Sequence, residues 1–175
     1  PYLYTEIQSE NDWRTMEVFD LKGEEIRHVG TSNDSPHGAL LNDPDGFYLT
    51  RRVDALGTYD AYRKFHVGES GMPVAENDVY TKVNVCDSKE DEAALVSTRE
   101  LPVTMMEADG SEKEERLPAG TKYYVRATDL ENFVDMELSD GRRCRLAVKK
   151  SDKGWGFEID GVYEEDCFEF IPYAG

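Results

Sequence analysis

The chain has 175 residues, and 39% of them are hydrophobic and 11% aromatic, which is enough apolar material for one compact domain or two small ones. Its 37 acidic and 20 basic residues give a formal net charge of −17 and a pI near 4.5. This acidity argues against nucleic acid or an anionic membrane surface as a partner of the chain as a whole, because neutralising phosphates requires clustered Lys and Arg. No apolar run approaches the roughly 20 residues of a transmembrane segment.

The first half of the chain alternates apolar and polar residues with a period of two, and turn residues interrupt the pattern about every eight to twelve positions. This pattern predicts an all-β structure. Turns are expected at Asp20–Gly23, at Asn42–Gly46 and around Leu56–Thr58. Around these turns we expect strands at residues 13–19, 25–29, 47–53, 59–67 and 79–85.

The composition changes at Ser88–Ala94 (SKEDEAA), where three acids and one lysine occur in seven residues. We interpret this segment as a linker, although a short helical turn capped by Ser88 and an extended acidic loop fit the same residues. The chain is therefore predicted to form two small β domains. A hairpin-rich N-terminal domain covers residues 1–92, and the second domain covers residues 93–175.

The second half repeats the alternating pattern. Tyr123, Val125 and Ala127 are expected on one face of their strand, and a charged turn is expected from Asp109 through Glu115. Five short strands in about 75 residues suit a small SH3-like barrel, because closing the sheet removes exposed edges. The expected strands are residues 101–106, 123–128, 133–138, 143–148 and 155–159.

The C-terminal region resembles a bacterial SH3-like module. In sequence it is similar to the module that ends a group of uncharacterised exported proteins or lipoproteins of Gram-positive gut bacteria. The matching elements are Leu117–Thr121 (LPAGT), Asp140–Arg142 (DGR), Ile159–Val162 (IDGV) and Pro172–Gly175 (PYAG). Two N-terminal elements of the same group also match, Ser9–Arg14 (SENDWR) and Leu56–Tyr59 (LGTY).

This resemblance implies a secreted or cell-surface-anchored location and an adhesive or ligand-binding role without enzymatic activity. It carries no catalytic residue and no cofactor. Because the chain begins at Pro1, we expect it to be part of a larger exported protein. The alternative is an accessory domain of a wall- or glycan-processing enzyme whose catalytic part lies elsewhere. The specific ligand and the oligomeric state are left open.

Cysteine and histidine positions give little support for a disulfide framework or a metal site. Cys86, Cys144 and Cys167 cannot all pair, and they read either as buried thiols or as a Cys144–Cys167 bridge with Cys86 left over. The three histidines, His28, His37 and His66, have no zinc-ligand spacing.

The Asn42–Gly46 loop (NDPDG) invites a calcium interpretation. An EF-hand loop with Gly46 at its sixth position would place Leu41 at the first and Arg52 at the twelfth, and neither residue can supply the required carboxylate. A looser oxygen site using Asp43 and Asp45 remains open beside the simpler interpretation as a turn.

The segment Arg142–Lys153 departs from the overall acidity, with six bases and one acid. Strand alternation places Arg143 and Arg145 on the outward face, where they could bind an acidic partner. The alternative is that these bases pair with Asp135 and Glu137 on the neighbouring strand.

Three aromatic residues, Tyr124, Phe133 and Trp155, are predicted to line a shallow groove for extended peptides or glycan faces. Burial of Trp155 against Phe157, in a bend formed by Gly154 and Gly156, is the alternative. The candidate ligand-binding set is therefore these three aromatics together with Arg143 and Arg145, as part of a binding module for a protein or cell-wall ligand.

Overall fold

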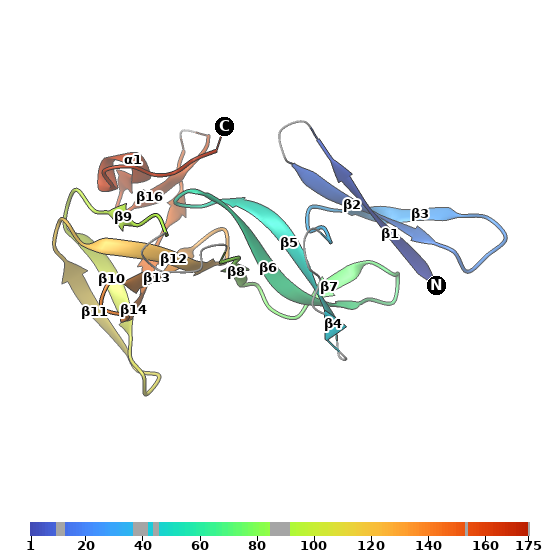
Figure 1. Ribbon diagram of the computed structural model, residues 1–175, viewed down its shortest axis with the longest axis horizontal. Coiled ribbons are helices and arrows are strands. Elements are labelled where there is room, and N and C mark those ends of the chain that lie inside the picture. Colours follow the sequence, from blue (N-terminus) through green and yellow to red (C-terminus); the bar gives the residue numbers. More distant parts are fainter. Residues whose placement is uncertain (10–12, 37–41, 44–45, 85–91, 153, 175) are drawn as a thin grey trace. The chain divides into compact units, whose positions relative to one another are not determined.

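The computed structural model describes residues 1–9, 13–36, 42–43, 46–84, 92–152 and 154–174. The all-β prediction is confirmed, because the strands form three antiparallel sheets and the one helix among the described residues is the single turn α1 (Glu164–Cys167) (Figure 1).

The chain divides into two compact units. The first comprises Pro1–Arg52 and Asp60–Asp78, and the second comprises Val53–Tyr59 and Val79–Ala174. The domain boundary at residue 92 stays a prediction. The second unit also includes Val53–Tyr59, the tip of a hairpin that is distant from the rest of the unit in sequence.

The first unit is built from two groups of strands. β1 (Tyr2–Gln8), β2 (Arg14–Asp20) and β3 (Arg27–Ser32) form one antiparallel sheet. β5 (Gly46–Asp54) pairs with β6 (Thr58–Val67), and these are flanked by β4 (Asn42–Asp43) and β7 (Pro73–Ala75). The strands expected at residues 13–19, 47–53 and 59–67 are present. Strand β1 was not predicted.

The core of the first unit follows from the alternation in these strands. Met16 and Val18 on β2 are fully buried and cluster with Leu49 and Phe65 from β5 and β6. The alternate residues of each strand face the opposite side, as a period of two requires. Partly buried residues complete the cluster: Tyr4, Val29, Phe47, Met72 and Ala75.

The main sheet of the second unit has the strand order β11-β10-β14-β13-β12-β8, and β9 also pairs with β12 (Figure 1). Its strands are β8 (Tyr80–Lys82), β9 (Leu95–Val96), β10 (Leu101–Met106), β11 (Glu112–Leu117), β12 (Lys122–Thr128), β13 (Phe133–Leu138) and β14 (Arg143–Ala147). A small second sheet contains β15 (Lys149–Lys150), β16 (Phe157–Ile159) and β17 (Val162–Tyr163).

The SH3-like barrel remains a prediction, because the strands of the described chain form no closed barrel. β11 stands at one end of the strand order and pairs with β10. The charged turn expected from Asp109 through Glu115 is wrong from Glu112 onward, because these residues form β11. Charged side chains on an edge strand disfavour pairing with a further strand, which explains why this strand resembles a loop in sequence.

A β-bulge in β12 changes which residues face the core. The register against β13 shifts between Val125 and Ala127, so Thr128 is fully buried opposite Val134. Ala127 lies opposite Asp135 instead, so the prediction that it shares a face with Tyr123 and Val125 is wrong. One extra residue in the strand reverses the alternation from that point on. The bulge also places Arg126 and Ala127 beside the outward residues of β13.

Candidate functional site

Four of the five predicted ligand-binding residues lie on the strands β12, β13 and β14. Arg143 is opposite Glu137 in the register, and Arg145 is opposite Asp135. Tyr124 lies opposite Glu137 from the other side, and Phe133 lies opposite Ala147. Inward residues alternate with them, including Met136, Cys144 and Leu146, which are fully buried. The sequence pattern therefore brings Tyr124, Phe133, Arg143 and Arg145 onto the outer face of one sheet.

Arg145 is already engaged within this face. Its guanidinium donates two hydrogen bonds to the Asp135 carboxylate, at 2.7 and 2.9 Å. The same guanidinium lies 3.6 Å from the centre of the Phe133 ring, a cation–π distance. The hydrogen bond with Asp135 raises the pKa of Arg145. The guanidinium of Arg145 thus covers the Phe133 ring while it binds Asp135. The alternative in which the bases of this segment pair with Asp135 and Glu137 is therefore correct for Arg145.

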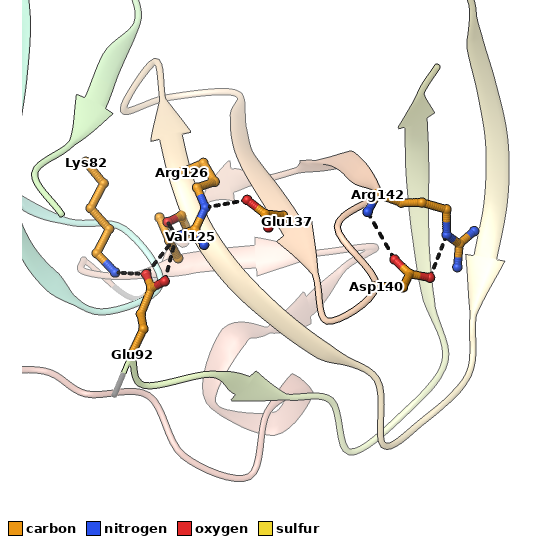
Figure 2. A network of polar contacts seen from close by, with 7 residues as sticks. All are labelled: Lys82, Glu92, Val125, Arg126, Glu137, Asp140 and Arg142. Carbon is orange, nitrogen blue, oxygen red and sulfur yellow. Dashed lines mark hydrogen bonds and ion pairs between the residues drawn. The ribbon is translucent and has the colours of Figure 1, made fainter. Parts of the chain in front are cut away.

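Glu137 is bound by Arg126 rather than by a residue of β14. Arg126 Nε donates to Glu137 at 2.9 Å, and its Nη1 donates to both oxygens of Glu92 at 2.7 and 2.8 Å (Figure 2). Lys82 Nζ adds a third hydrogen bond to Glu92, at 2.8 Å. Arg126 lies at the bulge in β12, between the two acids. The network Lys82–Glu92–Arg126–Glu137 connects β8, β12 and β13.

Glu92 is the buried centre of this network, since its side chain is only 5% exposed. Burial raises the pKa of its carboxyl, but hydrogen bonds from Arg126 and Lys82, together with their positive charges, outweigh that effect. The pKa of Glu92 therefore lies below its ordinary value, and the carboxylate is ionised at neutral pH. Nothing in the sequence pointed to this role, because Glu92 belongs to the acidic segment Ser88–Ala94 that was interpreted as a linker.

Arg143 differs from Arg145 because it is exposed and makes no ion pair within the described part of the chain. It lines a hollow of about 400 Å³ on the outer face of the sheet. Met106 and Arg126 line the same hollow, and Met106 lies opposite Arg143 in the register of β10 and β14. The remaining lining residues are Thr81, Lys82, Asn84, Glu92, Ala127, Asp135, Met136 and Glu137.

Most other cations of the Arg142–Lys153 segment have partners. Arg142 donates from its backbone N and its Nε to Asp140, at 3.0 and 2.8 Å, within the hairpin turn (Figure 2). Lys150 lies 3.9 Å from Glu131, and both side chains are exposed. Lys149 is exposed and, like Arg143, has no ion pair among the described residues. Lys153 lies outside them.

Trp155 is not on the sheet face with the other four residues. It lies in the turn between β15 and β16, and its side chain is 56% exposed, so the alternative of a buried Trp155 is wrong. Gly154 and Gly156, on either side of it, have φ values of 98° and 72°. A bend of this kind favours glycine and directs the intervening side chain outward.

Glu164 is a buried acid that sequence reasoning missed. Its side chain is fully buried, and its Oε1 accepts a hydrogen bond of 3.0 Å from the Phe157 N–H. Burial raises the pKa of Glu164, and the Tyr173 hydroxyl and the backbone N–H groups of Phe157 and Leu56 only partly oppose this effect. The surrounding sequence, Tyr163–Cys167 (YEEDC), has the composition of a solvated turn.

The tip of the β5–β6 hairpin explains why Glu164 is enclosed. Leu56 is 1% exposed and has a φ of 56°, and Gly57 follows with a φ of 119°. Thr58 N donates to Pro172 O at 3.0 Å, and Ala174 N donates to Thr58 Oγ1 at 3.0 Å. The hairpin tip, the C-terminal segment and α1 therefore surround one carboxyl group.

Neither cysteine that the structure describes forms a disulfide bond. Cys144 and Cys167 are buried free thiols, so the bridge between them is absent. Burial raises the pKa of Cys144 to about 12 and also raises that of Cys167. Cys86 lies outside the described residues.

The described residues include no group of three or more His, Cys, Asp or Glu side chains arranged to hold a metal ion. His37 and Asp45, which were considered as metal ligands from the sequence, lie outside the described residues. No helix in the described chain is long and apolar enough to cross a membrane.

Comparisons with protein-family models, curated proteins and solved structures found no match to this chain.

Proposed function

We propose that the chain is a non-enzymatic binding module of the cell exterior, and that the outer face of its β10-β14-β13-β12 sheet binds an acidic, extended ligand such as a wall peptide. The observation that carries this proposal is Arg143, an exposed guanidinium that lies at the rim of a hollow of about 400 Å³ and has no ion pair with any residue the structure describes. The proposed exterior location rests on the resemblance of the C-terminal residues to the exported group.

The chemistry of the hollow favours a carboxylate. A guanidinium offers a planar pair of N–H donors that matches the two oxygens of a carboxylate. The acids closest to Arg143 are already neutralised, since Glu137 binds Arg126 and Asp135 binds Arg145. An incoming carboxylate therefore meets an unpaired cation without displacing an existing ion pair.

The side chains around Arg143 are held in place before a ligand binds. Arg126 is fixed by Glu92 and Glu137, and Met106 presents an apolar surface on the neighbouring strand. Fixed side chains lose less conformational entropy on binding, which increases the affinity available from a small number of contacts.

A fluorescently labelled wall stem peptide ending in a free carboxylate tests the proposal by fluorescence anisotropy. We expect binding to weaken about tenfold in Arg143→Ala, the loss typical of one charge-assisted hydrogen-bonded contact. The peptide with an amidated C-terminus should bind with a comparable loss, and added salt should weaken the wild-type interaction.

Lys149→Ala is the matched control, because it removes another exposed cation that lies outside the hollow and has no ion pair within the described ranges. This variant should bind as the wild type does. Equal binding by wild type and Arg143→Ala, equal losses in both variants, or no binding of the carboxylate peptide would each contradict the proposal.

A further inference from the structure

Trp155 is displayed at the tip of a tight turn. Ser151 N donates to Gly156 O at 3.0 Å, and Gly154 N donates to Ser151 O at 3.4 Å, which closes the turn. Gly156 cannot be replaced without strain, because its φ is positive and an added Cβ would collide with Glu164 Oε1. The glycines on either side adopt this bend without strain, and the turn presents an indole that is more than half exposed.

The exposed indole is held in place by two tyrosines. The Tyr163 ring lies 5.9 Å from the Trp155 ring at an interplanar angle of 83°, and the Tyr173 ring lies 5.7 Å away at 75°. Both contacts are edge-to-face, so neither tyrosine stacks flat on the indole. Tyr173 in turn interacts with the buried Glu164 carboxyl. The ring is therefore both exposed and orientated.

The other exposed tryptophan has different surroundings. Trp13 is 53% exposed, close to the 56% of Trp155, but the Arg52 guanidinium lies over its ring at 5.7 Å. A cation over the ring occupies the surface on which a ligand would stack. Equal exposure therefore does not make the two indoles equivalent, and Trp13 serves as an internal control for Trp155.

We propose that Trp155 is a stacking platform for a neutral carbohydrate, specifically a β-linked oligosaccharide of gluco-configured pyranoses. This ring has all its bulky substituents equatorial, so both of its faces present axial C–H groups that can lie flat against an indole. The inference goes beyond the proposed function, because it assigns a second surface and a ligand of different chemistry.

Two exposed carboxylates near the platform can accept hydrogen bonds from a neutral polyol. Asp152 is exposed in the same turn as Trp155. Glu165 is exposed next to Glu164 and acts electrostatically on Tyr163. Carboxylates accept hydrogen bonds from sugar hydroxyl groups and repel an anionic ligand. The platform at Trp155 is therefore suited to a neutral ligand, whereas the hollow at Arg143 is suited to an acidic one.

Chitotetraose, a β-1,4-linked tetramer, tests this proposal in a titration of the ¹⁵N-labelled chain. The chain has two tryptophans, so its two indole N–H signals can be followed separately after assignment with Trp13→Phe and Trp155→Phe. We expect the Trp155 signal to shift saturably while the Trp13 signal stays in place. Mannotetraose, whose axial hydroxyl group disturbs one ring face, should bind more weakly.

Variants separate this proposal from the one at Arg143. Trp155→Ala should weaken chitotetraose binding about tenfold, the scale of one aromatic contact, whereas Trp13→Ala and Arg143→Ala should bind as the wild type does. No saturable shift of the Trp155 signal, equal shifts of both indoles, or a shift caused only by a basic peptide would overturn the carbohydrate assignment. The wild-type titration decides the question even if Trp155→Ala fails to fold.

Discussion

Asp135 receives two hydrogen bonds from Arg145, at 2.7 and 2.9 Å, across the β13–β14 pair. Two residues earlier on β14, the equivalent partnership between Glu137 and Arg143 is absent, because Arg126 binds Glu137 from β12. Neighbouring arginines on one strand face therefore have different roles. Arg145 connects two strands and covers Phe133, whereas Arg143 is exposed and forms no ion pair with the residues that the structure describes.

Replacing Arg145 with alanine should destabilise the fold by about 1 kcal/mol, because the change removes a partly exposed bidentate pair and a cation–π contact. Replacing Arg143 with alanine should leave the free energy of unfolding within about 0.5 kcal/mol of the wild type, as expected for an exposed side chain without such contacts. Urea denaturation measures both values. Equal destabilisation by the two variants would show that Arg143 also has a structural role.

Glu92→Gln should be among the most destabilising single changes to a polar residue in the second unit. The substitution removes a buried negative charge that serves both Lys82 and Arg126. Breaking a fully buried pair costs roughly 3–5 kcal/mol, and we expect about 2 kcal/mol here because both cations are partly exposed. Glu137→Gln, which weakens a hydrogen bond from Arg126 nearer the surface, should cost less. Urea midpoints at pH 7 provide the comparison.

The lowered pKa of the Glu92 carboxyl predicts that the stability of the fold depends on pH in the acidic range. The pKa of Glu92 is lower in the folded chain than in the unfolded chain, so its stabilising contribution is present above the ordinary carboxyl pKa of about 4.3. That contribution is lost as the pH falls through the folded value. The difference in stability between wild type and Glu92→Gln should therefore shrink between neutral pH and strongly acidic pH, and a constant difference would contradict this account.

The sequence was informative about the strands because each one carries its own alternating pattern. The expected strands at residues 101–106 and 133–138 match β10 and β13 at both ends. β11 was missed because an edge strand needs no apolar face of its own, and its exposed charged residues resemble a loop. An alternating sequence pattern thus predicts strands with one buried face, but it does not predict an exposed strand at the edge of a sheet.

The site was only partly predictable, for a different reason. Alternation makes Arg143 and Arg145 equivalent, and what separates them is the bulge in β12 that brings Arg126 to Glu137. Glu164 was not predictable, because its burial depends on a hairpin tip about a hundred positions earlier in the chain, around Leu56. Sequence patterns report which face a residue occupies, whereas partners are set by long-range contacts.

The buried thiols should be chemically silent in the folded chain. The pKa of Cys144 is raised to about 12 and that of Cys167 is also raised, so neither forms much thiolate at pH 8. In a Cys86→Ser variant, which removes the remaining cysteine, a thiol reagent should find no reactive group in the native state. It should find two after denaturation. Rapid labelling under native conditions would contradict the burial of these side chains.

Glu164 predicts a pH response opposite to that of Glu92. Its pKa is higher in the folded chain than in the unfolded chain, so its contribution to stability is full below the ordinary carboxyl pKa and is lost as the pH rises through the folded value. Glu164→Gln keeps an acceptor for the Phe157 N–H but cannot ionise. At neutral pH this variant should therefore be more stable than the wild type, by about 1–3 kcal/mol if the wild-type cost equals that of an unsatisfied buried polar group. Glu165→Gln, at the exposed neighbouring position, controls for the change in net charge. Urea midpoints from pH 4 to pH 8 should diverge for Glu164→Gln as the pH rises, and parallel profiles for both variants would refute a raised pKa at Glu164.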